Sequence, residues 1–63
     1  KIDYVIQING KKRVILNESR DIDEDSLMKV IQSKKLLEKF LKDKSIDKII
    51  FVKNRLINIL LND

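Results

Sequence analysis

Sixty-three residues, 43% of them hydrophobic and 38% charged, form at most one small domain, and we expect a single accessory domain over residues 1–63. The chain has no cysteine and no histidine, so disulfides and the commonest zinc ligands are excluded and the core must come from Ile, Leu and Val. This apolar content argues against disorder. No apolar run approaches the roughly 18 residues of a membrane span, and we expect no membrane partner. Because the first residue is Lys1 and not Met, we expect a fragment of a larger protein.

The net charge of +4 is distributed unevenly. Residues 1–17 carry three net positive charges, residues 18–28 carry four net negative charges, and residues 29–48 carry four net positive charges. A basic balance fits a polyanionic partner, although many lysine-rich surfaces are only solvated. Charge alone leaves both interpretations open.

The first predicted element is a β-hairpin. Residues 4–8 are β-branched and aromatic, which is typical of a strand. Asn9-Gly10 follows, the strongest short-range signal for a hairpin turn, and residues 11–17 return as a second strand.

Two registers are possible for this hairpin. A strict two-residue loop pairs Ile8 with Lys11 and Ile6 with Arg13, which puts charges beside apolar side chains. A loop or bulge that includes Lys11 makes the pairs mostly apolar, and we favour it. It predicts the pairs Ile8 with Lys12, Ile6 with Val14 and Tyr4 with Leu16, and leaves Gln7, Arg13 and Ile15 on the outer face near Lys11.

Two helices are predicted next. Asp23 is a candidate N-cap for a helix over about residues 24–32, and Ile22 and Leu27 have the spacing of a hydrophobic staple. Ser33 is a candidate cap for a second helix over about residues 34–43. The apolar stripe of that helix would consist of Leu36, Leu37, Phe40 and Leu41. A single bent helix over 24–43 is the alternative, since neither Pro nor Gly marks a break.

The last element is a second hairpin. Residues 48–52 and 56–61 are dense apolar runs, and Lys53-Asn54-Arg55 between them predicts a turn in which Asn54 adopts a left-handed conformation. The runs lack clean alternation and predict no core face. The order β-β-α-α-β-β predicts an α+β fold, in which two hairpins form a mainly antiparallel sheet with two short helices packed on one face.

Five features of the sequence are not assigned a function. Asp21-x-Asp23-x-Asp25 resembles the start of a calcium loop, but Ser26 and Gln32 stand where that loop needs Gly and Glu, so we expect no metal site. Without His or Cys there is no evident catalytic base or nucleophile, and one glycine is too few for a phosphate-cradling loop. The cations at 34, 35, 39 and 42 are interpreted as a solvated helix face, and the amide of residue 58 as bonding a neighbouring backbone.

The two hairpins carry a family resemblance. Residues 6–13, Ile-Gln-Ile-Asn-Gly-Lys-Lys-Arg, resemble the hydrophobic-Gln-hydrophobic-Asn-Gly-Lys-x-Arg hairpin that opens the C-terminal domain of bacterial-type leucyl-tRNA synthetases. Residues 49–59 are similar to that family's final hairpin, and Phe40-Leu41 and Lys44 match positions near the end of its second helix. The chain departs from the pattern at Asp43, where the family usually has Gly, and at Lys53-Asn54, where it has Pro-Gly. Asp and Asn tolerate positive φ, so we expect the fold to be kept.

The resemblance implies a non-catalytic domain that binds the elbow of leucine tRNA, where the D and T loops meet, and that hangs on the rest of the synthetase by a flexible tether. It implies a cytoplasmic parent enzyme, leucine–tRNA ligase, whose other domains use ATP and Mg. We expect no cofactor in this domain and a monomer. The alternative is a docking module without RNA contact, whose exposed sheet face or edge packs on another protein domain.

The candidate RNA contacts lie in the two turns. They are Lys11, Lys12 and Arg13 in the first hairpin and Lys53 and Arg55 in the last. Lys and Arg neutralise phosphates, and Arg can also stack on a base or bond it bidentately. We expect the two turns to present these charges on a common surface. The competing interpretation is that they are ordinary solvated charges at sheet edges.

Overall fold

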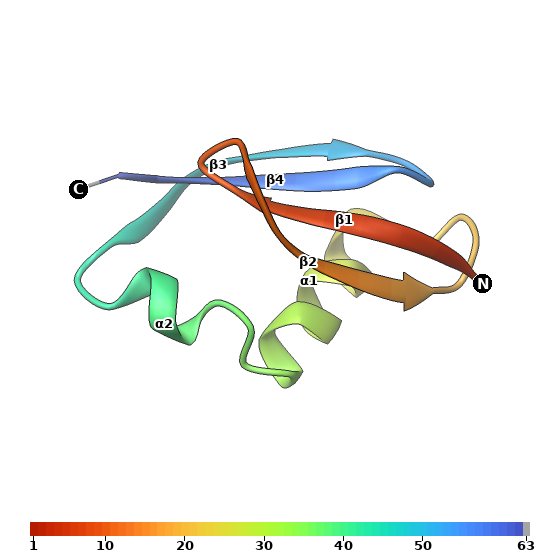
Figure 1. Ribbon diagram of the computed structural model, residues 1–63, viewed down its shortest axis with the longest axis horizontal. Coiled ribbons are helices and arrows are strands. Elements are labelled where there is room, and N and C mark those ends of the chain that lie inside the picture. The colour runs from red at the N-terminus through yellow and green to blue at the C-terminus, as the bar shows by residue number, and fades with distance from the viewer. Residues whose placement is uncertain (63) are drawn as a thin grey trace.

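Four strands and two helices follow one another over residues 1–62, the part of the chain that the computed structural model describes, in the predicted order β-β-α-α-β-β (Figure 1). They are β1 (Ile2–Ile8), β2 (Lys11–Glu18), α1 (Glu24–Ser33), α2 (Glu38–Leu41), β3 (Ser45–Val52) and β4 (Leu56–Asn62). Both helices lie on one side of the sheet, and its other face is uncovered (Figure 1). The predicted α+β class is therefore confirmed. Neither helix in these residues is long and apolar enough to cross a membrane.

The sheet has the strand order β2-β1-β4-β3. Its two outer pairings are antiparallel hairpins, as predicted, but the central pair β1 and β4 is parallel, from Val5 opposite Leu56 to Ile8 opposite Ile59. Parallel neighbours run in the same direction, so the turn that follows β1 and the turn that precedes β4 must lie at opposite ends of the sheet. Figure 1 shows the two turns separated along the long axis of the molecule.

The register of the first hairpin combines the two alternatives. Ile6 pairs with Val14 and Tyr4 with Leu16, as predicted, but Ile8 pairs with Lys11 and not with Lys12. Asn9 and Gly10 have φ angles of 51° and 81°, so this dipeptide forms its preferred two-residue turn. The register then shifts between Ile6 and Gln7, which leaves Arg13 as the extra residue of a β-bulge. A bulge was anticipated, but its position at Lys11 was wrong.

The core lies between the sheet and the helices. Alternate residues of β1 and β4 point toward the helices, and this settles the core face of the second hairpin: Ile57 and Ile59 are fully buried. The Tyr4 and Phe51 rings stack with their centroids 6.5 Å apart. The buried residues are Tyr4, Ile6, Ile8, Leu16, Leu27, Ile31, Leu37, Ile57 and Ile59.

The first helix forms as its sequence predicts. Asp23 is the N-cap, and its Oδ1 accepts a hydrogen bond from the Ser26 N–H at 2.8 Å. Leu27 and Ile31, one helical turn apart, are fully buried. Ile22 packs against the same core, consistent with the predicted staple.

The second helix is much shorter than predicted. It spans four residues, begins after Leu37 without a side-chain cap, and leaves Ser33 to donate to the Val30 carbonyl. The reason is a Schellman motif at the end of α1: Lys35 has a φ of 56° and donates to the Gln32 carbonyl, and Leu36 donates to the Ile31 carbonyl. This turn also rules out the single bent helix. Glycine usually occupies such a position, so a lysine gave no signal in the sequence. After α2, positive φ falls on Lys42 and not on Asp43.

Candidate nucleic-acid interface

The turn of the first hairpin is fastened to β4 by two amide side chains. Asn9 Oδ1 accepts from the Leu61 N–H at 2.8 Å, and Asn58 Oδ1 accepts from the Gly10 N–H at 3.0 Å. The Asn9 N–H donates to the Ile59 carbonyl at 3.0 Å. The predicted backbone role of Asn58 is confirmed. These bonds restrict the motion of the segment that carries the first three candidate cations.

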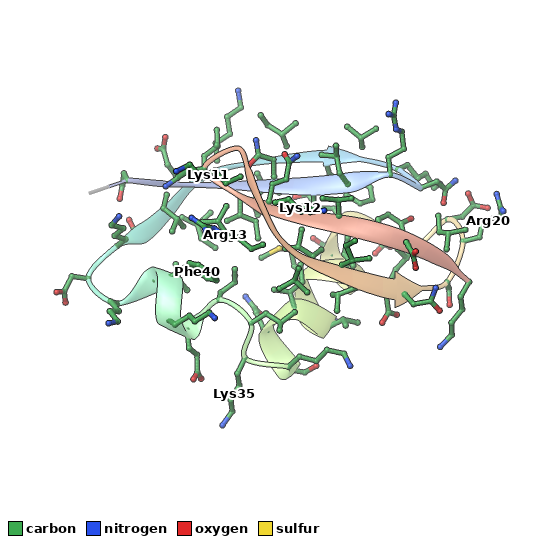
Figure 2. The ribbon with its side chains drawn as sticks, in the orientation of Figure 1. Lys11, Lys12, Arg13, Arg20, Lys35 and Phe40 are labelled. Carbon is green, nitrogen blue, oxygen red and sulfur yellow. The ribbon has the colours of Figure 1, made fainter. Side chains whose placement is uncertain are left out.

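Arg13 lies against α2, contrary to its predicted place on the outer face. Its guanidinium carbon is 5.3 Å from the centroid of the Phe40 ring, within the range of a cation–π interaction. Figure 2 shows Arg13 between the hairpin and Phe40. The bulge explains the error, because it places Arg13 and Val14 on the helix side in succession, one over Phe40 and one opposite Ile6. Lys39, assigned to a solvated face, has its Nζ 5.4 Å from the centroid of the same ring.

A hollow of about 180 Å³ lies between the first hairpin, α2 and the end of β4. Two of the predicted contact residues, Lys11 and Arg13, line it together, and Lys12 does not. Lys12 pairs with Gln7, which lies between the buried Ile6 and Ile8, so Lys12 belongs to the uncovered face of the sheet. The residues that line the hollow are Ile8, Asn9, Lys11, Arg13, Phe40, Lys44 and Leu61. We call it the hairpin–α2 hollow.

Lys53 and Arg55 lie at the far end of the sheet and do not share a surface with the first turn. The expectation of one common surface was therefore wrong, because no local motif indicates that β1 and β4 are parallel. Lys53 is close enough to Asp23 to interact with its charge. The pKa of Asp23 is lowered mainly by the bond from the Ser26 N–H, then by the Ser26 side chain, and further by Lys29 and Lys53.

The second turn has a structural role. Asn54 has a φ of 63°, as predicted, and its backbone N–H and side-chain oxygen both bond the Tyr4 hydroxyl. Its amide also pairs with Asp21, accepting from the Asp21 N–H at 2.7 Å and donating to the Asp21 carboxylate at 2.8 Å. Asp21 of the acidic segment thus helps to fix this turn.

The uncovered face of the sheet carries exposed apolar side chains. Ile15 is 50% exposed, Ile50 41% and Val52 39%, although each belongs to a regular strand. Scattered apolar residues are normal on a protein surface, but one sheet face that gathers several marks a possible protein contact.

No family model matches the chain. The chain is 40% identical over 57 residues to the leucine–tRNA ligase of Prochlorococcus marinus (strain MIT 9301), which covers 90% of this chain and 7% of the ligase. It is 31% identical over 61 residues to that of Buchnera aphidicola subsp. Baizongia pistaciae, which covers 97% of this chain and again 7% of the ligase.

A solved structure has the same fold. The LeuRS of Agrobacterium radiobacter K84, in its ternary complex with tRNA and LeuAMS, matches 97% of this chain with a TM-score of 0.85 at 23% identity, over 8% of its own length. This chain therefore spans less than a tenth of the proteins it matches. The chain matches one short segment of these proteins over nearly its whole length, and it belongs to the leucine–tRNA ligase family.

Proposed function

We propose that the chain is the C-terminal accessory domain of a leucyl-tRNA synthetase and binds the elbow of leucine tRNA, where the D and T loops meet. The observation that carries this proposal is the rigid basic hairpin: Lys11, Lys12 and Arg13 follow a turn that Asn9 and Asn58 fasten to β4. Cations on a fixed backbone suit a structured RNA, because little side-chain and loop entropy is lost when they meet phosphates. The relationship to leucine–tRNA ligases indicates which RNA.

In this proposal the domain takes no part in the chemistry. Leucine activation with ATP and Mg, transfer and editing belong to other domains of the cytoplasmic parent enzyme. The domain needs no cofactor, acts as a monomer, and is joined to the synthetase by a flexible tether. A few phosphate contacts give modest, salt-dependent affinity, and the tether raises the effective concentration of the domain at the bound tRNA.

We assign the main contact to the first hairpin. Lys53 and Arg55 are exposed, but Asp21 and Asp23 stand beside their turn. Carboxylates at that end weaken its attraction for phosphate. In the proposal these two cations make at most a separate, weaker contact.

The test is a fluorescence titration of the chain with leucine tRNA at several salt concentrations. The paired variants Lys11→Gln/Arg13→Gln and Lys53→Gln/Arg55→Gln each remove one Lys and one Arg, from opposite ends of the sheet. We expect the first pair to weaken binding strongly and to reduce the slope of log K against log salt by about 2, at roughly one per lost phosphate contact. We expect the second pair to have a smaller effect. Equal weakening by both pairs, or no binding to the natural chain at low salt, contradicts the proposal.

A second function, docking on another protein domain, is favoured by the exposed Ile15, Ile50 and Val52 on the uncovered sheet face. It predicts that the chain binds a synthetase lacking this segment and that Ile50→Lys abolishes this binding. Sedimentation of the mixture measures the complex. Docking without any tRNA binding would replace the first proposal.

A further inference from the structure

We infer that the hairpin–α2 hollow is a binding site for one phosphate group, and that Phe40 positions the Arg13 guanidinium in it. That the phosphate belongs to an RNA backbone rests on the proposed function. The site itself rests on the geometry of the hollow.

The hollow gathers cations from separate parts of the chain. Lys11 and Arg13 come from β2, and Lys44 comes from the segment after α2. Among residues 1–62, no Asp or Glu lines it. A site with basic residues on several sides favours an anion. Its volume of about 180 Å³ leaves room for a phosphate group together with water.

The aromatic ring in the hollow is already in contact with cations. Arg13 and Lys39 approach the Phe40 ring to 5.3 and 5.4 Å from its centroid. A nucleobase that stacked on this ring would compete with them for its faces. Phe40 therefore fits the role of a positioning residue for Arg13 better than that of a stacking platform for a base.

A guanidinium held in this way is suited to a phosphate. Its planar fork of N–H groups can bond two phosphate oxygens at once, and contact with a ring through its face leaves the N–H edge available. The neighbouring turn is also fixed, through the Asn9 and Asn58 bonds to Leu61 and Gly10. The Arg13 guanidinium and the backbone that carries Lys11 are thus held in place before the anion arrives, which reduces the entropy lost on binding.

The first test is an NMR titration of the chain with inorganic phosphate and, separately, with adenosine, an uncharged nucleoside. We expect phosphate to shift the Arg13 Nε–H signal and the Lys11 side-chain signals, and adenosine to leave them and the Phe40 ring signals unchanged. Arg13→Gln should reduce phosphate affinity by about tenfold, as expected for a lost charge-assisted bond. A response to adenosine without one to phosphate would make the hollow a base pocket and overturn the inference, as would no response to either.

The second test concerns the positioning role. Phe40→Leu removes no charge, yet we expect it to lower phosphate affinity about two- to fivefold, the size of a lost cation–π interaction. Phe40→Trp, which keeps an aromatic face, should retain the affinity and show that a loss in Phe40→Leu is not simple unfolding. In the Arg13→Gln background, Phe40→Leu should have no further effect. Additive losses would show that Phe40 acts independently of Arg13.

The two proposals can fail separately. If the chain does not bind leucine tRNA but phosphate shifts the Arg13 signal, the tRNA function falls and the phosphate site stands. If tRNA binds and phosphate leaves Arg13 unaffected, the function stands and the phosphate site falls.

Discussion

The Tyr4 hydroxyl donates to Asn54 Oδ1 at 3.1 Å and accepts from the Asn54 backbone N–H at 3.0 Å. These two residues are 50 positions apart, and the pair connects the first strand to the turn of the second hairpin. Tyr4 is fully buried, so its hydroxyl needs such a partner. Asn54 supplies it while adopting the positive φ that the turn requires.

We expect Asn54→Ala to destabilise the domain more than Asn54→Gly. Both variants remove the side-chain bonds to Tyr4 and Asp21 and keep the backbone N–H bond to the Tyr4 hydroxyl. The loss costs about 1–3 kcal/mol because the buried hydroxyl loses its acceptor. Alanine adds a further penalty of about 1–2 kcal/mol for its left-handed backbone, and glycine does not. Urea denaturation of the two variants measures the difference. Equal stabilities would show that the backbone conformation of Asn54 is not under strain.

The hydrogen bonds that hold the first turn to β4 should have a measurable effect on hydrogen exchange. Asn58→Ala removes the acceptor of the Gly10 N–H, so we expect this amide to exchange faster and the free energy of unfolding to fall by about 1 kcal/mol. Asn17→Ala is the matched control, because the Asn17 side-chain amide donates to the exposed Asp3 carboxylate at the other end of the same hairpin. If Asn17→Ala accelerated exchange at Gly10 as much, the effect would reflect general loosening of the hairpin.

The start of α1 should be sensitive to acid. The folded-state pKa of Asp23 lies below its ordinary value of 3.8, so its stabilising effect is complete above that value and is lost as the pH falls through the folded pKa. Asp23→Asn keeps a good N-cap but does not titrate. The stability difference between the natural chain and Asp23→Asn, followed by denaturation from neutral pH downward, should therefore shrink below pH 3.8. A constant difference would mean that the charge of Asp23 is immaterial to the helix.

We expect burial to decide how much stability is lost when a large aliphatic residue is shortened to alanine. Leu27 is fully buried against the sheet, and we expect Leu27→Ala to cost about 2–5 kcal/mol, much of the stability of a domain of this size. Ile15 is 50% exposed, and Ile15→Ala should cost less than about 1 kcal/mol. Thermal unfolding measures both. A large loss from Ile15→Ala would show that the uncovered face is packed against something in solution.

Local signals in the sequence predicted the elements well. Asn9-Gly10, the Asp23 cap and the left-handed Asn54 each act within a few residues, and all three are found as predicted. The second helix was overestimated because its limit is set by Lys35, a residue that adopts positive φ only because the Schellman turn around it is stabilised by backbone bonds. Nothing in the lysine itself indicates this conformation.

The arrangement of the candidate site depended on longer-range features. Sequence reasoning identified the cations of the first hairpin but not their neighbours, because the contact between Arg13 and Phe40 joins residues 27 positions apart across a bulge. It also placed Lys12 on the face of Ile8 and Lys11 near the outer face, whereas the structure has the two lysines the other way round. The pairing of β1 with β4, which separates the two turns, is set by packing of the whole core and by no local motif.

The parallel central pair also constrains how the domain folds. Each hairpin can form from neighbouring residues, but the continuous sheet forms only when Val5–Ile8 meets Leu56–Ile59, which requires closing a loop of about 50 residues. Removal of the final strand would therefore take away the partner of both β1 and β3, and not merely one edge of the sheet. The sheet should consequently form in a single late step that brings the opposite ends of the chain together, with a folding rate typical of mixed α/β proteins and not of isolated hairpins.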